Sequence, residues 1–475
     1  MLIPLILLPL VAALLAVVAP WHQARSLLLV VGSAGHLLMT GVLLAQPAVV
    51  GTPWLGLDAL SRLVLLVTSL LFFGCAFYAV GYLEYHRVRG NRVMVPCLLV
   101  FLSAMTLAVL ARHFGLLWLA VETTTLASAP LIYYNRNRLS IEATWKYLLL
   151  CSIGIALALL GIFFIGYGAL VGGVHPVDLQ LDALLAAAPD LSRPWLHAGF
   201  VFILVGFGTK MGLAPLHCWK PDAYGEAPGL VGALLAGGLT SVAFLAILRA
   251  LQLMNAAGDG PLARQALLIM GLLSMTVAAI SMVRQPDIKR LLAYSSVEHM
   301  GILAIGVGMG KLATFGALLH LVNNALTKGG LFLSVANLQR GYASKKLWEV
   351  RGAIATLPVS GTLFLAGFLA ITGSPPFGPF MSLFTILRGV FGQGATAVGL
   401  GMLVLLAVVF VGMGATVLTA TQGPAVQLDT PYQDKLLVVL PPLGFVLLVL
   451  VLGLWLPEPL VSLIREASAL LEVTS

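Results

Sequence analysis

The stretch Leu148–Gly168, LLLCSIGIALALLGIFFIGYG, indicates the fold class of this chain. It holds 21 residues without a charged side chain, which is the length with which an α-helix crosses ~30 Å of hydrocarbon. Polar and apolar residues do not alternate along it, as they would in a strand of a membrane barrel. Because backbone polar groups inside a bilayer must bond to one another, the stretch predicts a membrane-spanning helix.

Similar apolar stretches recur along all 475 residues, of which 60% are hydrophobic and 9% are charged. Soluble domains carry roughly 25% charged residues, so this chain lacks the side chains for a water-facing surface. We therefore predict an all-α integral membrane protein with about 14 transmembrane helices. The expected spans are 2–20, 26–46, 58–81, 93–111, 114–134, 144–168, 195–218, 228–250, 265–283, 291–309, 312–338, 354–392 (interrupted), 396–420 and 434–456.

The first span begins without a basic segment and is longer than the apolar core of a typical signal peptide, so we interpret it as a helix. The net charge of +8 follows from the loops. Those after odd-numbered helices hold 15 Lys and Arg residues, Lys220 and Lys289 among them, and those after even-numbered helices hold 6, to which Arg249 at the end of its span is assigned. The positive-inside rule then places the odd-numbered loops in the cytoplasm and both termini outside. The charge is a topology signal and does not indicate a nucleic-acid partner.

Two of the expected helices, the seventh and the twelfth, are broken in a similar way by proline and glycine. The seventh holds Pro215 and the twelfth holds GSPPFGP over 373–379. Proline removes a backbone donor and breaks a helix, and paired broken helices are typical of inverted repeats with an ion site at the membrane midplane. We therefore predict two inverted five-helix repeats, although kinks without a repeat are the alternative. The expected domains are 1–90 (helices 1–3), 91–250 (first repeat), 264–420 (second repeat) and 421–475 (helix 14 and the tail).

Subtraction of the loop and tail charges leaves a small set of ionisable residues inside predicted helices. A charge at the bilayer centre costs at least ~2.5–3.5 kcal/mol, so it persists only where it is paired, hydrated or functional. The cationic members are Arg62, Lys146, Lys210 and Lys328, and the others are Glu122, Glu298, His299 and His320.

Glu122 is followed by three threonines, whose hydroxyls can orient its carboxylate, and Lys210 follows Thr209 just before the first break. A buried Glu/Lys pair whose separation changes is a switchable proton store. A static salt bridge between two helices is the alternative interpretation.

His320, Asn324 and Lys328 recur every four residues and therefore lie close to one helix face. They predict a proton wire or, alternatively, a polar seam that joins helices. No second His lies three or four residues from His320, and the four Cys residues are scattered, so a haem or metal site is disfavoured and no cofactor is expected. The sequence also lacks a nucleophile triad and a nucleotide-binding loop, and no catalytic residue is assigned.

Two motifs, GTKMGLAPLHCWKPDAYGEAP over 208–228 and QPDIKRLLAYSSVEHMG over 285–301, resemble the antiporter-like subunits of respiratory complex I, Mrp cation/proton antiporters and energy-converting hydrogenases. The resemblance covers roughly 55–420. Residues 122–125, 142–147 and 152–161 look most like component F of the hydrogenase-4 type. This implies a prokaryotic inner (cytoplasmic) membrane and partner membrane subunits in a complex I-like or group 4 hydrogenase-like assembly, whose redox centres lie elsewhere.

The resemblance also implies site residues. It assigns proton translocation to Glu122, Lys210, His320 and Lys328. The supporting residues are Lys146, Thr209, Ser241, Asn324, His217, Asp222, Glu298 and His299. Two positions depart from the family pattern, because Ser241 and Leu383 stand where relatives usually carry a charge. The expected relay therefore lacks a bridging group and its terminal group.

Three functions follow from these features. The leading one is a proton-translocating, non-catalytic subunit of a multi-subunit oxidoreductase complex, driven by electron transfer elsewhere. A structural or coupling subunit with an incomplete proton path is the second, favoured by Ser241 and Leu383. A Na⁺/H⁺ antiporter subunit is the third, disfavoured because few intramembrane carboxylates are available for Na⁺.

Overall fold

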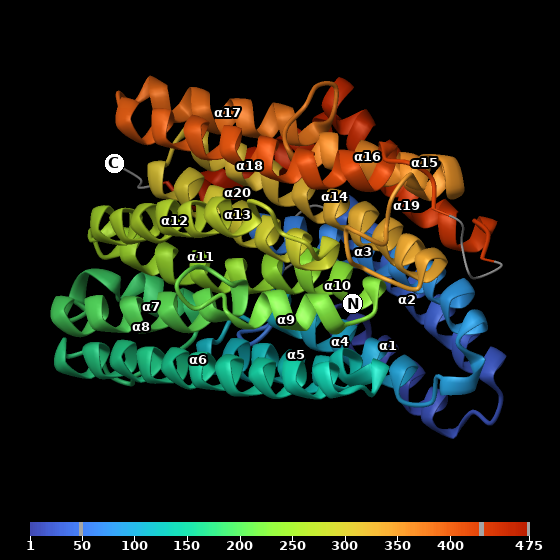
Figure 1. Cartoon of the computed structure of the whole chain (residues 1–475). Coiled ribbons are helices and arrows are strands. Elements are labelled where there is room, and N and C mark those ends of the chain that lie inside the picture. The colour runs from blue at the N-terminus through green and yellow to red at the C-terminus, as the bar shows by residue number, and fades with distance from the viewer. Residues whose placement is uncertain (47–50, 427–431, 473–475) are drawn as a thin grey trace.

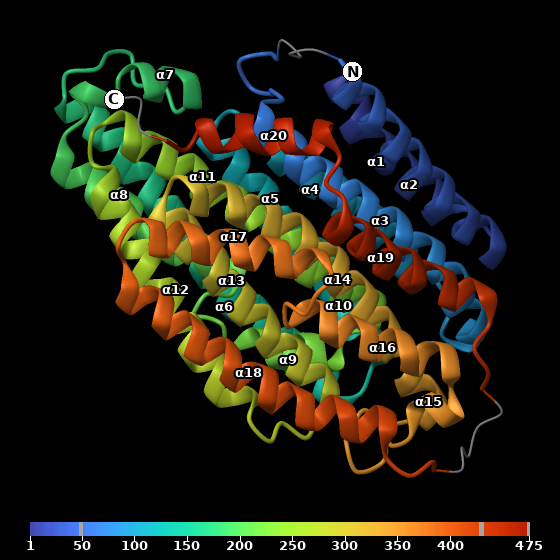
Figure 2. The ribbon, with the colours of Figure 1, turned by 90° about the horizontal axis from the view of Figure 1, so that it is seen from above.

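The computed structural model describes residues 1–46, 51–426 and 432–472, and within these ranges every regular element is helical. The helices run roughly side by side and form an elongated bundle (Figures 1 and 2). Nine helices among the described residues are long and apolar enough to cross a membrane, and three shorter apolar helices accompany them. The all-helical membrane architecture that the sequence predicts is therefore confirmed.

The first half of the chain follows the expected spans closely. The elements are α1 (Leu2–Val18), α2 (His22–Ala45), α3 (Ala59–Tyr85), α4 (Met94–Leu110), α5 (Phe114–Ile132), α6 (Arg138–Val171), α7 (Leu181–Ala186), α8 (Arg193–Met211), α9 (Trp219–Glu226), α10 (Gly229–Ala233), the π-helical segment Leu234–Leu239 and α11 (Thr240–Ala256). The expected 228–250 span is thus one continuous helical stretch with a π-helical segment inside it. The interval 174–194, expected to be a loop, contains the short helix α7.

The second half begins with the tightly packed pair α12 and α13. The elements are α12 (Gly260–Met282), α13 (Ile288–Met309), α14 (Leu312–Tyr342), α15 (Ala353–Thr356), α16 (Pro358–Ile371), α17 (Gly378–Gly392), α18 (Thr396–Gln422), α19 (Leu436–Leu454) and α20 (Glu458–Ala469). Helix α14 contacts α3, α13, α16, α17 and α19 and so lies in the middle of the bundle. Figure 2 shows α1 and α2 along one edge and α18 along the opposite one.

Glycines allow the closest helix contacts, as expected where helices pack in lipid. A Cβ atom added to Gly161 on α6 would lie 2.6 Å from the carbonyl oxygen of Gly199 on α8. In the same way, a Cβ on Gly301 of α13 would lie 2.6 Å from the oxygen of Gly271 on α12. Larger side chains at these positions would push each pair of helices apart.

The two helices that were expected to break, near Pro215 and near Pro376, are both interrupted, as predicted. The first break separates α8 from α9, and its freed backbone is satisfied locally: Ala214 N donates to Ser274 Oγ at 2.9 Å, and Trp219 Nε1 donates to the Thr209 oxygen at 2.8 Å. The second break separates α16 from α17. Such side-chain partners are what broken helices need in a membrane.

An ion-pair cluster at the start of α3 includes an arginine that was assigned to a loop from the sequence. Asp58 caps α3 and bonds Arg112 and Arg249, and the Arg249 Nη2–Asp58 Oδ1 distance is 2.9 Å. The sequence analysis counted Arg249 as a loop residue, but it is 2% exposed because α11 extends beyond the expected span end at 250. Lys220 and Lys289, also counted in loops, are equally buried.

Candidate functional site

Lys210 and Glu122 are joined through the hydroxyl of Thr125. Lys210, fully buried in the last turn of α8, donates to Thr125 Oγ1 at 2.7 Å. Thr125 in turn donates to Glu122 Oε2 at 3.0 Å, and Ser152 Oγ donates to Oε1 at 3.1 Å. Within the described residues no ion pair joins Glu122 and Lys210 directly. The two predicted residues therefore meet through one hydroxyl.

The local chain explains why Lys210 tolerates burial. Helix α8 ends at Gly212, whose φ of 81° permits the left-handed cap, and a helix C-terminus attracts a cation. Lys210 Nζ also donates to Tyr147 OH at 2.8 Å, and this hydroxyl lies 2.6 Å from Ser128 Oγ. Sequence reasoning overlooked Tyr147.

Lys146 does not belong to this buried cluster, contrary to expectation. Its side chain is 46% exposed and forms ion pairs with Glu142 at 2.6 Å and Asp222 at 2.9 Å. Neighbouring residues of a helix point in different directions, so Tyr147 faces the interior while Lys146 faces outward. Asp222, a further expected site residue, also pairs with Arg290 and holds α9 to α6 and α13. Both residues thus belong to an outer ion-pair network.

Lys220 is a buried lysine that the sequence analysis missed. It is the second residue of α9, fully buried, and its Nζ donates to Ser296 Oγ on α13 at 3.1 Å. Its side chain folds back over Gly212, where an added Cβ would lie 2.1 Å from Lys220 Cε. The break in the helix thus carries a second lysine back into the interior. The sequence feature that could have indicated this buried lysine is its place next to Trp219 in the first motif.

Lys328 contacts Ser295 of α13, the residue next to the Ser296 that binds Lys220. Its Nζ donates to Ser295 Oγ at 2.7 Å and to the Leu292 oxygen at 3.3 Å. Lys220 and Lys328 are therefore bound by neighbouring serines, Ser296 and Ser295. Among the described residues no carboxylate forms an ion pair with either lysine.

His320 lies in a chain of three hydrogen-bonding side chains. Its Nε2 is 2.9 Å from His299 Nδ1, and its Nδ1 is 2.8 Å from Ser382 Oγ on α17. The sequence analysis singled out Leu383 as the end of the path, but the neighbouring Ser382 makes the contact. Leu383 instead belongs to an apolar cluster with Ile386.

Glu298 and Asn324 lie on α13 and α14 between the Lys328 and His320 contacts. Both are 2% exposed, and Glu298 Oε2 and Asn324 Oδ1 have no hydrogen-bond partner. Glu298 Oε2 is 4.0 Å from His299 Nε2. A buried oxygen without a partner is costly, so these two atoms mark acceptor positions between the two contacts.

The remaining expected residues have local roles. Thr209 Oγ1 donates to the Val205 oxygen at 2.7 Å, and Ser241 Oγ donates to the Gly237 oxygen at 2.6 Å, each within its own helical stretch. His217 lies half-buried in the first break, with Nδ1 unpartnered. No group of three or more His, Cys, Asp or Glu side chains in the described parts of the chain is arranged to hold a metal ion.

Comparisons with known proteins identify the class. Residues 111–414 match the family described as NADH:quinone oxidoreductase/Mrp antiporter, transmembrane, and the chain belongs to this family. It is 33% identical over 429 residues to the hydrogenase-4 component F homolog of Methylacidiphilum infernorum (isolate V4), covering 87% of this chain and 88% of the relative.

Two further comparisons agree. NADH-quinone oxidoreductase subunit N of Desulforudis audaxviator (strain MP104C) is 30% identical over 385 residues, with 77% of this chain and 75% of the relative covered. A chain of respiratory complex I from Thermus thermophilus superposes with a TM-score of 0.79 at 26% identity, covering 96% of this chain and 97% of that one. The protein is therefore an antiporter-like, multi-pass membrane subunit of the complex I, hydrogenase and Mrp family, and its relatives are subunits of multi-subunit complexes.

Proposed function

We propose that this subunit conducts protons along a polar row that is buried except at the half-buried Glu122, and that electron transfer elsewhere in a larger complex drives the movement. The polar row consists of Glu122, Thr125, Lys210, Lys220, Ser296, Ser295, Lys328, His299, His320 and Ser382. The observation that supports it most is the set of three buried lysines, each bound by a hydroxyl and none ion-paired with a carboxylate among the described residues.

The chemistry of the row suits proton transfer. Lysine and histidine side chains accept and release protons, and hydroxyls both donate and accept hydrogen bonds. Lys220 takes the bridging position that Ser241 was expected to leave empty. Ser382 extends the row past His320, so Leu383 does not close it. These two contacts favour proton conduction over a purely structural subunit.

The oxygens of Glu298 and Asn324 provide the connection between Lys328 and His320. Each oxygen is a buried acceptor without a partner, and a bridging water is stable where it bonds to such polar groups. A proton leaving Lys328 then reaches His299 and His320 through short hydrogen-bonded steps.

We further propose 14 transmembrane helices in the inner membrane, with the odd-numbered loops cytoplasmic and both termini outside. The two breaks, near Pro215 and Pro376, support two inverted repeats over 91–250 and 264–420, flanked by 1–90 and 421–475. The subunit itself carries no catalytic residue in this proposal, and neighbouring membrane subunits supply the redox coupling.

A Na⁺/H⁺ antiporter subunit is the second candidate, because the matching family includes Mrp antiporters. The polar row disfavours it, since five of its ten residues are lysines or histidines, Glu122 is its single carboxylate, and Na⁺ prefers oxygen ligands.

The test is proton flux through the assembled complex in proteoliposomes, with a potassium diffusion potential imposed by valinomycin and the dye pyranine inside. Lys210→Ala should reduce the flux at least ~10-fold, since a positioned proton-transfer group contributes that much or more. The matched control Lys146→Ala should keep it, because Lys146 lies outside the row. Equal flux in both variants would contradict the proposal, and flux that requires Na⁺ would favour the antiporter.

A further inference from the structure

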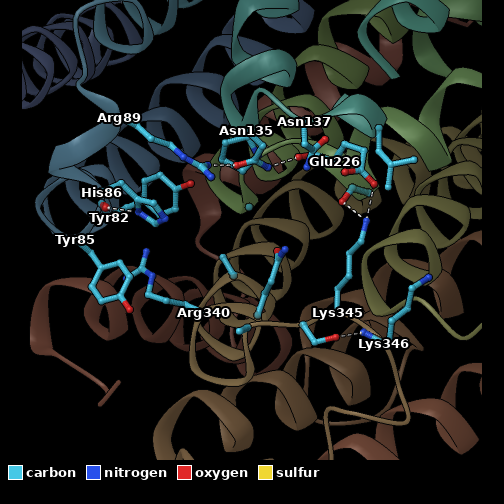
Figure 3. Close-up of a pocket in the computed structure, with 18 residues that line it drawn as sticks. Tyr82, Tyr85, His86, Arg89, Asn135, Asn137, Glu226, Arg340, Lys345 and Lys346 are labelled. Atoms are coloured by element: carbon cyan, nitrogen blue, oxygen red, sulfur yellow. Dashed lines mark hydrogen bonds and ion pairs between the residues drawn. The ribbon is translucent and has the colours of Figure 1, made fainter. Parts of the chain in front are cut away.

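A polar cavity of about 620 Å³ opens at the end of the bundle where α9 and α14 end. Figure 3 shows Arg89, Asn135, Glu226, Arg340 and Lys345 around it. This volume is far above what one water molecule needs, and the lining offers many hydrogen-bonding groups. The cavity is therefore a place where water reaches into the protein.

The floor of this cavity is the C-terminus of α9, where three successive carbonyl oxygens each accept a hydrogen bond. Lys345 Nζ donates to Gly225 O at 2.8 Å, Asn135 Nδ2 donates to Glu226 O at 2.6 Å, and Lys289 Nζ donates to Ala227 O. A helix C-terminus favours such cationic and N–H donors. Asn135 and Lys345 line the cavity, whereas Lys289 is 1% exposed and lies behind the floor.

Lys289 differs from its neighbours in its partners. Lys345 pairs with Glu226 at 2.7 Å and with Asp287 at 3.3 Å, and Lys346 pairs with Asp287 at 3.6 Å. Among the described residues no carboxylate forms an ion pair with Lys289. It is thus a buried amine near the cavity-lining Glu226 and the buried Asp287, and both of these acids pair with other lysines.

Lys289 lies on the same helix as the two partners of Lys328 in the polar row. It lies on α13 three residues before Leu292, whose carbonyl oxygen accepts a hydrogen bond from Lys328 Nζ at 3.3 Å. Three residues of helix correspond to a rise of ~4.5 Å. Lys289 is thus the second residue of the helix that holds Lys328 through Leu292 and Ser295.

We propose that Lys289 is the first buried proton acceptor of the path and that the cavity is its aqueous entrance. This inference rests on the proposed function. A hydronium ion in the cavity water supplies the proton: one of its O–H bonds breaks and leaves a water molecule as an N–H bond forms at the neutral Nζ of Lys289. The amine returns to neutral when the proton passes on toward Lys328.

The alternative is that Lys289 only fastens α13 to the end of α9. An arginine at position 289 distinguishes the anchoring role from the proton-accepting role. Its guanidinium donates the same hydrogen bond but does not release its proton. In the proteoliposome assay described above, Lys289→Arg and Lys289→Met should both reduce flux at least ~10-fold, as for any relay group. The control Lys345→Arg should keep at least about half of the wild-type flux. Lys345 acts through its charge and hydrogen bonds, which arginine also provides.

Wild-type flux in assembled Lys289→Arg would overturn the inference. It would leave the proposed function intact as long as Lys210→Ala still loses flux, so the two failures are distinguishable. If Lys289→Arg does not assemble, Gln339→Cys on the cavity wall decides the question. Modification of this cysteine with a bulky cationic methanethiosulfonate should abolish flux, with treated wild-type complex as the control. Undiminished flux after complete modification would also overturn the inference.

Discussion

Lys220 Nζ donates a hydrogen bond to Ser296 Oγ at 3.1 Å, next to the Ser295 hydroxyl that accepts from Lys328. Lys220 and Lys328 thus reach adjoining residues of α13 from two different helices. This relationship provides the central link of the proposed path.

Lys220→Met should reduce proton flux through the assembled complex at least ~10-fold, because the methionine cannot carry a proton. Ser241→Ala is the control, since Ser241 bonds only within its own helical stretch. The proteoliposome assay compares the two variants directly. A larger loss in Ser241→Ala than in Lys220→Met would restore Ser241 as the bridging residue and contradict this assignment.

Gly212→Ala should disturb the contact between Lys220 and Ser296 without removing a charged group. The added Cβ would lie 2.1 Å from Lys220 Cε, and the φ of 81° is a conformation that alanine disfavours. We expect the flux to fall several-fold and the melting temperature to drop, with a cost of about 1 kcal/mol from the backbone alone. Gly258→Ala, with φ 81° and open space around its Cβ, is a matched control for strain. Equal flux in both variants would show that the position of Lys220 does not matter.

Ser382→Ala should interrupt the row beyond His320, because the serine hydroxyl is the partner of His320 Nδ1. We expect a loss of flux of about fivefold, the equivalent of one hydrogen bond of ~1 kcal/mol. Ser382→Thr retains the hydroxyl and should retain the flux. If the alanine variant conducts as well as the threonine variant, protons leave the row before Ser382.

Asp58→Asn should destabilise the protein in a pH-dependent way. Burial alone would raise the pKa of the Asp58 carboxyl, but the charges and hydrogen bonds of Arg249, followed by Arg112, outweigh burial and hold this pKa below its usual range. The ion pairs therefore contribute stability above pH ~4, and that contribution is lost as the pH falls further. At pH 7 the free energy of unfolding of the variant should be roughly 3–5 kcal/mol lower than that of the wild type.

Thermal unfolding of the purified complex at pH 7 and at pH 3.5 measures this effect. The wild type should lose more stability on acidification than Asp58→Asn does. An identical pH dependence in the two proteins would assign the acid sensitivity to other groups.

The fold class could be predicted from the sequence because long uncharged stretches are stable in a bilayer only as helices. Both breaks were predictable for a similar reason, since proline removes a backbone donor. The burial of Lys220 and Lys289 was not predictable by counting charges between apolar spans. Each follows a proline-containing stretch, and only the folded chain shows that the side chain turns back into the bundle.

The main residues of the proposed row were recognisable in the sequence, but the contacts between them were not. Glu122, Lys210, His320 and Lys328 were recognisable as charges or imidazoles inside apolar segments. Thr125, Ser295, Ser296 and Ser382 join them, yet hydroxyl residues are common in membrane helices and carry no distinctive spacing. Lys146 was misplaced because composition does not reveal which face of a helix is buried.

The most direct test of proton conduction is the double variant Glu122→Gln, Lys210→Ala in the assembled complex. Both substitutions lie at the Thr125-bridged pair at the Glu122 end of the row and remove its two ionisable side chains. Proton flux into pyranine-loaded proteoliposomes should fall to the level of liposomes without protein, while the subunit remains in the purified complex. Wild-type flux in this double variant would contradict the account and identify the subunit as structural.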